Sequence, residues 1–459
     1  MGELLAQARA LAAAGEDSAA RNAFVAILQR DPTHLAALNE LGNLAFSGGY
    51  RAAACSAYRQ AIQHHPQDAL VRVNLGNALA ADQDHAGALQ AYEAALAIDP
   101  QFSAAHRGIG TLLQDLDPER AEVHLARAFA GSSMVSQPYR GSGTGVPLLL
   151  LVSARGGNIP VQSWINDRDF AITAVYMESW REGELLPAHA LICNAVGDAN
   201  RCPLALRRAA VLVARATVPV INDPTAVART GRVEGAHRLA GLPDVVTPRT
   251  QLASAADLEA LPAGAFPLLL RRPGFHTGRH FLRVDAAADL AAALQSLGEG
   301  PLIAIQYLDV RGADGLARKF RVLFVDGTAY PVHLAISADW KVHYFTAEMS
   351  LSQALRDEER CFLEDMPAVL GRRGVAALDA IRGALQLEYA GVDFALAPDG
   401  RVVVFEANAT MVVAKPGPEP IWDYRRPALD AVTEAARAML LRRVRTAPGV
   451  RTPRRDPGA

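Results

Sequence analysis

Small, aromatic and proline residues recur at a spacing of 34 positions through the first third of the chain. The repeating set is Leu41, Gly42, Ala54, Tyr58, Ala61 and Pro66, which returns as Leu75, Gly76, Ala88, Tyr92, Ala95 and Pro100. Weaker copies include Ala20, Phe24 and Pro32 before this set and Ile109, Gly110, Ala121 and Leu125 after it. Glycine and alanine let two helices approach closely, an aromatic ring fills the gap to the next unit, and proline ends the second helix. The pattern therefore predicts an array of helical hairpins over residues 1–131.

This period and this order of residue types resemble the tetratricopeptide repeat. The resemblance implies an all-α array that binds a peptide or a partner protein, or that forms the interface of a homodimer. The array is acidic, because residues 1–131 hold 9 basic and 14 acidic side chains, a net charge of −5. Residues 132–145 are rich in glycine and serine, so we expect a linker there.

Apolar runs of strand length alternate with helical patterns from Val146 onward. The strand-like runs include 146–154, 171–178, 189–197, 266–272, 281–284 and 302–310. The first three, with a helical pattern after them, predict an α/β domain over residues 146–222. The later strands and helices predict two α+β modules, over residues 223–305 and 306–441.

A predicted hairpin holds the clearest chemical pattern. Asp399 and Gly400 favour a two-residue turn. Counting outward from that turn pairs Ala397 with Val402, Ala395 with Val404, and Asp393 with Glu406. Alternation along the strands then directs Phe394, Leu396, Val403 and Phe405 toward the core and places Asn408 on the face of Glu406.

Two carboxylates opposed across a ladder repel each other unless a cation lies between them. Carboxylate and carboxamide oxygens are the ligands that hard divalent cations prefer. We therefore predict a metal site formed by Asp393, Glu406 and Asn408. The alternative is a pair of solvated charges on an edge strand.

The ending GVDF…VVVFEANAT, residues 391–410, resembles the metal-binding hairpin of the ATP-grasp superfamily. Members of this superfamily include D-alanine–D-alanine ligase, glutathione synthetase and the ribosomal-protein glutamate ligases. Upstream segments are similar to the family in order and spacing, from residue 146 to about residue 440. The resemblance implies a multidomain chain, with the all-α tetratricopeptide repeat array followed by an α/β pre-domain and two α+β ATP-grasp subdomains. It also implies ATP and two Mg²⁺ ions as cofactors.

The same resemblance assigns roles to further residues. Those implied for nucleotide binding are Arg232, Arg271, Gly274, Gly278, Gln306, Tyr307, Asp309 and Lys319. Those implied near the transferred phosphate are Arg321, Lys341 and His343. A strand here would place Lys341, His343 and Phe345 on one face, for which a solvated strand face is the alternative.

The chain departs from the family at two points. Arg232 and Arg271 stand where the family has phosphate-binding lysines, and NATMVV stands where N-x-x-P-G is expected after the metal-binding asparagine. A guanidinium still binds phosphate, with two hydrogen bonds in place of a point charge. The altered loop lies where the resemblance places the acceptor substrate. It therefore leaves the identity of the substrate open.

Composition restricts the remaining choices. Half of the 459 residues are hydrophobic and a fifth are charged, which excludes wholesale disorder. Four scattered cysteines and no long apolar run lead us to expect a reduced, cytoplasmic protein without a membrane partner. A net charge of −2 gives no reason to expect nucleic-acid binding. Residues 442–459 hold six arginines and one aspartate among proline and glycine, which predicts a disordered basic tail.

Lysine is rare in this chain. Of 46 basic residues only Lys319, Lys341 and Lys415 are lysines, so we expect these positions to serve chemistry. The sequence as a whole favours an ATP-dependent ligase that joins a carboxylate substrate to an amine acceptor, of peptide or amino-acid type, through an acyl phosphate. The alternatives are a degenerate ATP-grasp scaffold that only binds, and a small-molecule kinase on the same fold.

Overall fold

The computed structural model describes residues 1–114, 116–141, 143–275, 280–342, 348–413, 416–417 and 419–446. The chain divides into two compact units. The first comprises residues 1–148, 154–156 and 167–188, and the second comprises residues 149–153, 157–166 and 189–459. Strand β2 (Val146–Val152) spans the division between them.

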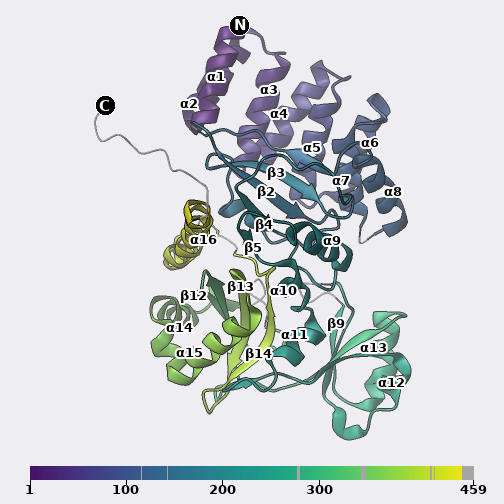
Figure 1. The fold of residues 1–459 in the computed structure, drawn as a ribbon, viewed down its shortest axis with the longest axis vertical. Coiled ribbons are helices and arrows are strands. Elements are labelled where there is room, and N and C mark those ends of the chain that lie inside the picture. The colour runs from purple at the N-terminus through teal and green to yellow at the C-terminus, as the bar shows by residue number, and fades with distance from the viewer. Residues whose placement is uncertain are drawn as a thin grey trace. The chain divides into compact units, whose positions relative to one another are not determined.

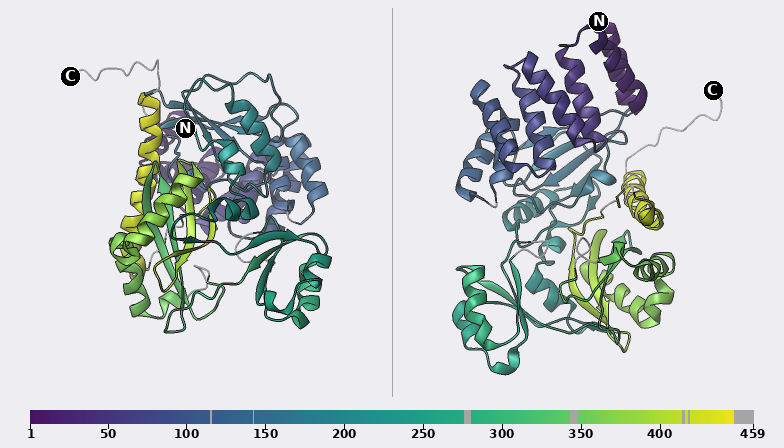
Figure 2. Two further views of the ribbon diagram at one scale, coloured as in Figure 1. Left: turned by 60° about the horizontal axis from the view of Figure 1, so that its bottom comes forward. Right: turned by 180° about the vertical axis from the view of Figure 1, so that it is seen from behind.

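Eight helices form the predicted array among the described residues of the first unit. They are α1 (Gly2–Ala14), α2 (Asp17–Arg30), α3 (Leu35–Ser47), α4 (Arg51–His64), α5 (Ala69–Ala81), α6 (His85–Ile98), α7 (Ser103–Leu113) and α8 (Pro118–Ala128). Helices α3, α5 and α7 begin 34 residues apart, as do α2, α4 and α6. The helices stack in chain order (Figure 1), and the same order is visible from behind (Figure 2, right). The sequence period therefore reports a structural repeat.

The recurring glycines make room for the recurring tyrosines. A Cβ atom on Gly42 would lie 2.3 Å from the ring of Tyr58, and one on Gly76 would lie 2.5 Å from the ring of Tyr92. Tyr92 also touches Gly108 in the next repeat, where a Cβ would lie 2.6 Å from its ring. The ring of Tyr92 therefore fills the gap to the next repeat, as the sequence predicted.

We expect Gly76→Ala to destabilise the first unit by about 1–3 kcal/mol, because the added methyl group overpacks against the buried Tyr92 ring. Thermal unfolding measures the effect. Gly383→Ala is the matched control: Gly383 lies in helix α15 (Met366–Leu385) with nothing within 4 Å of the new methyl group, so the helix gains about 0.5–1 kcal/mol. Equal effects of both substitutions would contradict the packing role.

A histidine pair joins the last two helices of the array. The Nδ1 atoms of His106 and His124 lie 3.0 Å apart, and Nε2 of His106 lies 3.0 Å from the carbonyl oxygen of Pro100. A carbonyl oxygen only accepts, so Nε2 of His106 holds its proton and Nδ1 accepts from His124. Burial, and then the neighbouring His106, lowers the pKa of His124 below its ordinary value of 6.5.

The histidine pair predicts acid sensitivity. Because the unfolded chain binds the His124 proton more readily than the folded chain, the free energy of unfolding should fall as pH drops below about 6.5. His124→Gln should flatten the dependence of the unfolding midpoint on pH between about pH 7 and 5. Identical slopes for this variant and the wild type would show that the pair does not sense pH.

The expected linker is partly ordered as a strand. Strand β1 (Met134–Ser136) pairs antiparallel with β3 (Phe170–Tyr176), and both lie in the same compact unit as the array. Phe129, after α8, packs on Tyr176 with ring centroids 4.3 Å apart. The interpretation of residues 132–145 as a plain linker is wrong at 134–136, because the backbone there pairs with residues 173–175 of β3, which composition does not reveal.

From residue 189 onward the second unit holds strands β4 (Leu191–Asn194) and β5 (Val220–Ile221), which pair in parallel. Helix α9 (Pro203–Val213) lies in the connection between them. Helices α10 (Pro224–Ala228) and α11 (Arg232–Leu239) follow. Asn194 is fully buried and its amide donates to the carbonyl oxygens of Val196 and Asn222, which is a structural role.

A four-stranded antiparallel sheet comes next, in the order β7-β10-β8-β9. Its strands are β7 (Thr250–Ala253), β8 (Leu268–Arg271), β9 (Phe281–Val284) and β10 (Leu302–Gln306). Helices α12 (Ala255–Glu259) and α13 (Leu290–Leu297) pack against it around Leu258, Leu270 and Leu290. Strand β10 ends at Gln306, earlier than the predicted 302–310.

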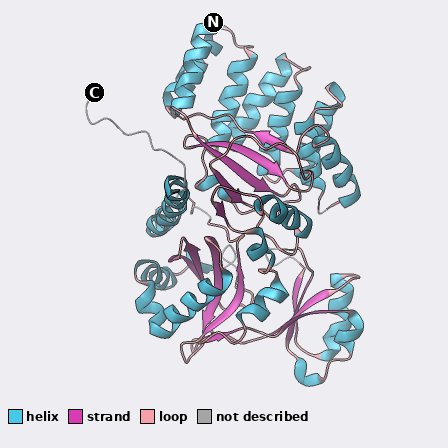
Figure 3. Ribbon diagram, viewed as in Figure 1, coloured by secondary structure: helices cyan, strands magenta, loops and turns pink. Residues whose placement is uncertain are grey.

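The last sheet has the order β12-β11-β13-β14-β6. Its strands are β6 (Val245–Val246), β11 (Ala317–Val325), β12 (Thr328–Ser337), β13 (Tyr389–Leu396) and β14 (Val402–Asn408). Only β6 runs parallel to its neighbour. The helices packed on this sheet include α14 (Gln353–Glu364), α15 and α16 (Arg426–Thr446), drawn in cyan beside the magenta strands (Figure 3). Phe320 stacks on Phe394 in its core, with ring centroids 5.4 Å apart.

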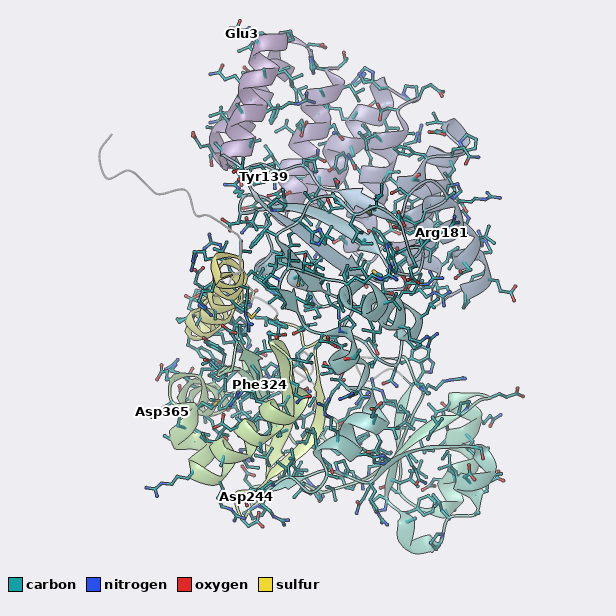
Figure 4. The ribbon with its side chains drawn as sticks, in the orientation of Figure 1. Glu3, Tyr139, Arg181, Asp244, Phe324 and Asp365 are labelled. Atoms are coloured by element: carbon teal, nitrogen blue, oxygen red, sulfur yellow. The ribbon has the colours of Figure 1, made fainter. Side chains whose placement is uncertain are left out.

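Two details correct the predicted boundaries. Strand β6 falls inside the range 223–305 but belongs to the last sheet. Directly before it, Asp244, labelled in Figure 4, pairs with Arg373 of α15. Helix α16 continues to Thr446, so residues 442–446 are helical and not tail. None of the helices within the described residues has the length and apolar character needed to cross a bilayer.

Candidate active site

The predicted pair of carboxylates is present on β13 and β14. Asp393 lies opposite Glu406 in the antiparallel ladder, and the amide of Asn408 donates to Oε1 of Glu406 at 2.7 Å. Both acids and the carboxamide therefore lie on one face, as the alternation predicted.

The turn that produces this pairing differs from the predicted one. Ala397 donates its N–H to the carbonyl oxygen of Arg401, which closes a three-residue loop with Gly400 at φ 81°. That loop shifts the nearer pairs by one residue, so Ala395 lies opposite Val403 and Leu396 opposite Val402.

An irregularity in the ladder restores the predicted pairing at the acids. Phe405 is an extra residue between the pairs Phe394–Val404 and Asp393–Glu406. Phe405 is 36% exposed and lines the pocket described below, so its assignment to the core is wrong. The bulge explains this, because it turns the side chain away from the alternation of a regular strand.

Asp393 is neutralised by two basic side chains from β11. Its carboxylate accepts from Nε and Nη2 of Arg321 at 2.6 and 2.8 Å, and Nζ of Lys319 lies 3.1 Å away. Asp393 is only 4% exposed. Burial by itself raises the pKa of this carboxyl, but the charges of Arg321 and Lys319 outweigh burial and hold the pKa well below its usual range.

Glu406 is neutralised from a different element. Arg232 is the first residue of α11, and its Nη2 lies 2.8 Å from Oε1 of Glu406. The backbone N–H of Arg232 donates to the side chain of Asn200 at 3.0 Å. The arginine predicted from the family's phosphate-binding position thus lies beside the predicted metal site.

Arg271 ends β8 and is 7% exposed. Its Nε donates to the carbonyl oxygen of Phe275 at 3.1 Å, and its guanidinium carbon lies 5.4 Å from the ring centroid of Phe281. Burial, and then the charge of Arg232, lowers the pKa of Arg271 to about 10, so it remains charged at neutral pH. Gly274 forms the turn after β8 with φ 79°, whereas Gly278 lies outside the described residues.

The residues expected to hold the nucleotide base lie at the end of β10 and directly after it. Gln306 accepts a backbone hydrogen bond from Arg249, and Arg283 lies 4.3 Å from the ring centroid of Tyr307. Asp309 is paired with Arg311, whose hydrogen bonds lower the pKa of Asp309 to about 2. The Asp309 carboxylate is therefore occupied by a neighbour.

Lys341 does not lie on a strand. Strand β12 ends at Ser337, and Lys341 follows in a bend, where its Nζ lies 3.4 Å from the carbonyl oxygen of Phe281. The strand prediction for this segment is wrong at Lys341, because Ala338, Asp339 and Trp340 bend the backbone before it. His343 and Phe345 lie outside the described residues.

Most of the predicted site residues line one cavity of about 470 Å³. The predicted residues that line it are Arg232, Arg271, Gln306, Tyr307, Asp309, Lys319, Arg321, Lys341, Asp393, Glu406 and Asn408. Gly274 lines a smaller hollow of about 60 Å³ that shares Arg232, Arg271 and Glu406 with it. The volume is within the range of small-molecule sites. The four-stranded sheet and the last sheet both contribute walls.

Sequence reasoning missed several residues of this cavity, among them His333 and Trp340. Buried His333 lies opposite Arg321 in the ladder, and burial, followed by the charge of Arg321, lowers its pKa well below 6.5, so the imidazole is neutral at pH 7. Counting from the turn at Asp326 and Gly327 would have placed Val332 there, but a register shift moves His333 in. Trp340 contacts Phe281 and Tyr307 edge to face, and no sequence pattern signalled it.

Comparison with known proteins identifies no family for this chain. No family model matches this sequence. No curated protein matches it either. Matching solved structures include a crystal structure of MamA, at 25% identity over 27% of this chain and 74% of that one, and MamA 41-end from Desulfovibrio magneticus RS-1, at 23% identity over 27% and 71%. Both have a TM-score of 0.26, too low to bear on fold or function.

The donor set itself indicates what the cavity can bind. Apart from the exposed Asp309–Arg311 pair, the charged lining consists of Arg232, Arg271, Lys319, Arg321, Lys341, Asp198, Asp393 and Glu406. This gives an excess of two positive charges, which suits an anion. The two opposed carboxylates and one carboxamide suit a hard cation. No group of three or more His, Cys, Asp or Glu side chains among the described residues could hold a metal, so such a cation needs ligand oxygens besides these.

Proposed function

We propose that the second unit is an ATP-dependent ligase, which activates a carboxylate as an acyl phosphate and joins it to an amine. The observation that supports this most is the opposed Asp393–Glu406 pair, surrounded by basic side chains from β8, β11 and α11 in one cavity. Such a site accommodates both the cation and the phosphates of a metal–nucleotide complex. Two of the three lysines in the chain, Lys319 and Lys341, line it.

Each group has a role in this proposal. Asp393, Glu406 and Asn408 hold Mg²⁺, which when bound screens the charge between the phosphates. Arg232 and Arg271 orient the phosphates, and Arg321 and Lys341 stabilise the phosphoryl group in transfer. Tyr307 and Gln306 contact the base.

The chemistry balances in two steps. A carboxylate oxygen of the substrate attacks the γ-phosphorus, and the bond between that phosphorus and the bridging oxygen of ADP breaks. The amine then attacks the carbonyl carbon of the acyl phosphate, inorganic phosphate leaves, and the amine proton passes to solvent. The protein contributes position and charge stabilisation.

A screen for ADP release against amino acids and peptides, with mass spectrometry of the products, tests the proposal. A product lighter by one water than the sum of its substrates is the expected result. A product heavier by one phosphate would instead identify a kinase. Nucleotide binding without ADP release from any substrate would favour a scaffold.

Arg271→Ala should weaken ATP binding about 10- to 100-fold, the loss expected for a charge-assisted hydrogen bond of about 1.5–3 kcal/mol. Arg271→Lys should retain more of the affinity, since it keeps the charge. Calorimetry measures both. Arg401→Ala is the control, because Arg401 pairs with Asp399 at the exposed hairpin turn and lines neither hollow. Full affinity in Arg271→Ala would remove this residue from the site.

For the first unit we propose recruitment of a peptidic substrate or partner protein, with self-association as the alternative. Removal of residues 1–145 is a poor test, because it deletes β1, which pairs with β3. Substitutions at exposed array positions such as Leu70 and Val25 leave that pairing intact. Activity on a peptide should fall in these variants while ATP affinity stays unchanged.

A further inference from the structure

The basic side chains proposed to bind phosphate are already bonded within the folded chain. The pairs are Arg232 with Glu406, Arg321 and Lys319 with Asp393, Arg271 with the Phe275 carbonyl oxygen, and Lys341 with the Phe281 carbonyl oxygen. Three of these five cations therefore neutralise the same two carboxylates that are proposed to hold the metal.

This sharing couples the two ligands. A polyphosphate that binds alone draws Arg232, Lys319 and Arg321 away from Asp393 and Glu406, and leaves two carboxylates facing each other, one of them buried. A divalent cation that binds alone enters beside Arg321 and Lys319, which are held 2.6 and 3.1 Å from Asp393. When both bind, the metal replaces the basic side chains at the carboxylates, and the phosphates receive them.

We infer that an exchange of ion-pair partners couples the binding of a divalent cation and a polyphosphate in this cavity, so that each binds weakly alone and more tightly with the other. The inference rests on the proposed function and adds that Arg232, Lys319 and Arg321 pair with the two carboxylates before the ligands bind and with the phosphates afterwards. Each ligand should raise the affinity for the other by about 10- to 100-fold, within the usual range of coupling between sites.

Calorimetry on the full chain tests the coupling with Mn²⁺ and inorganic tripolyphosphate. Tripolyphosphate carries the phosphates of a nucleotide without its base. Each is titrated alone and then in the presence of the other, and Mn²⁺ binding is also followed by electron paramagnetic resonance. We expect weak binding of each alone and at least about tenfold tighter binding together.

Arg232→Gln separates the exchange from simple charge attraction. It releases Glu406 from its cation, so Mn²⁺ alone should bind about tenfold more tightly than to the wild type, while the coupling to tripolyphosphate shrinks. Arg401→Gln is the control, since Arg401 pairs with Asp399 at the exposed hairpin turn. Circular dichroism checks folding, and Lys319→Gln, which removes one of the two cations at Asp393, takes its place if Arg232→Gln does not fold.

The outcomes separate this inference from the proposed function. Independent binding of Mn²⁺ and tripolyphosphate, or no binding of the two together, would overturn the inference. ADP release, measured on the same protein, judges the proposed function separately. Cooperative binding that shrinks in Arg232→Gln, without any ADP release, would support the ion-pair exchange and count against the ligase.

Discussion

Glu406→Gln is expected to lower the rate of ADP release by about 100- to 1,000-fold, the size typical of losing one preorganised charge contact to a transferring phosphoryl group. Glutamine keeps the shape of the side chain and an oxygen for the Asn408 amide, but removes the charge that faces Asp393 across the ladder. The metal would then lose one of its two carboxylates. Steady-state kinetics with saturating ATP measures the change.

Asp399→Asn is the matched control for this substitution. Asp399 lies on the same hairpin, at its exposed turn, and its carboxylate pairs with Arg401. The charge change is the same but lies away from the cavity, so turnover should be unaffected. A rate for Glu406→Gln close to that of Asp399→Asn would remove Glu406 from the reaction.

Asp393→Asn is expected to destabilise the second unit by about 3–5 kcal/mol, in addition to abolishing turnover. The substitution leaves Arg321 and Lys319 beside each other in a largely buried place without their counter-charge. Chemical denaturation of wild type and variant at neutral pH measures the loss.

Acid provides an independent check on Asp393. Because the folded-state pKa of Asp393 lies below its unfolded value of about 3.9, its contribution is complete above that pH and is lost as pH falls toward the folded pKa. The stability difference between wild type and Asp393→Asn should therefore shrink in acid. Equal stability of the two proteins at neutral pH would show that the ion pairs contribute nothing.

Local periodicity predicted the helical array, because each repeat buries the same glycine and tyrosine positions against its neighbours. The spacing of Gly42 and Gly76 matches the helix starts at Leu35 and Ala69. The Asp393–Glu406 pairing was also predictable, since both acids lie on strands joined by one short turn. In each case the decisive contact is near in sequence or repeats at a fixed interval.

Irregular backbone accounts for most of what the sequence did not reveal. The three-residue turn and the bulge at Phe405 cancel each other in register, so counting from a two-residue turn reached the right acids through the wrong intermediate pairs. A second shift, in the β11–β12 ladder, moves His333 opposite Arg321. Bulges depend on tertiary packing and leave no mark in a pattern of alternation.

Contacts between residues far apart in the chain could not be predicted from the sequence either. The strand at 134–136 forms because β3 offers it an edge, and α16 continues to Thr446 where Arg442 and Arg443 bind Asp326 at the β11–β12 turn. Neither partner is near in sequence. The partners of Arg232 and Arg321 could likewise not be predicted, although both residues were predicted for the site.

Calorimetric titration of the wild-type chain with ATP and excess Mg²⁺ tests the central claim most directly. We expect one binding site per chain, with affinity lost when Mg²⁺ is removed by a chelator and strongly reduced in Glu406→Gln. The absence of nucleotide binding to the wild type, or equal binding by wild type and Glu406→Gln, would contradict the assignment of this cavity to a metal–nucleotide complex.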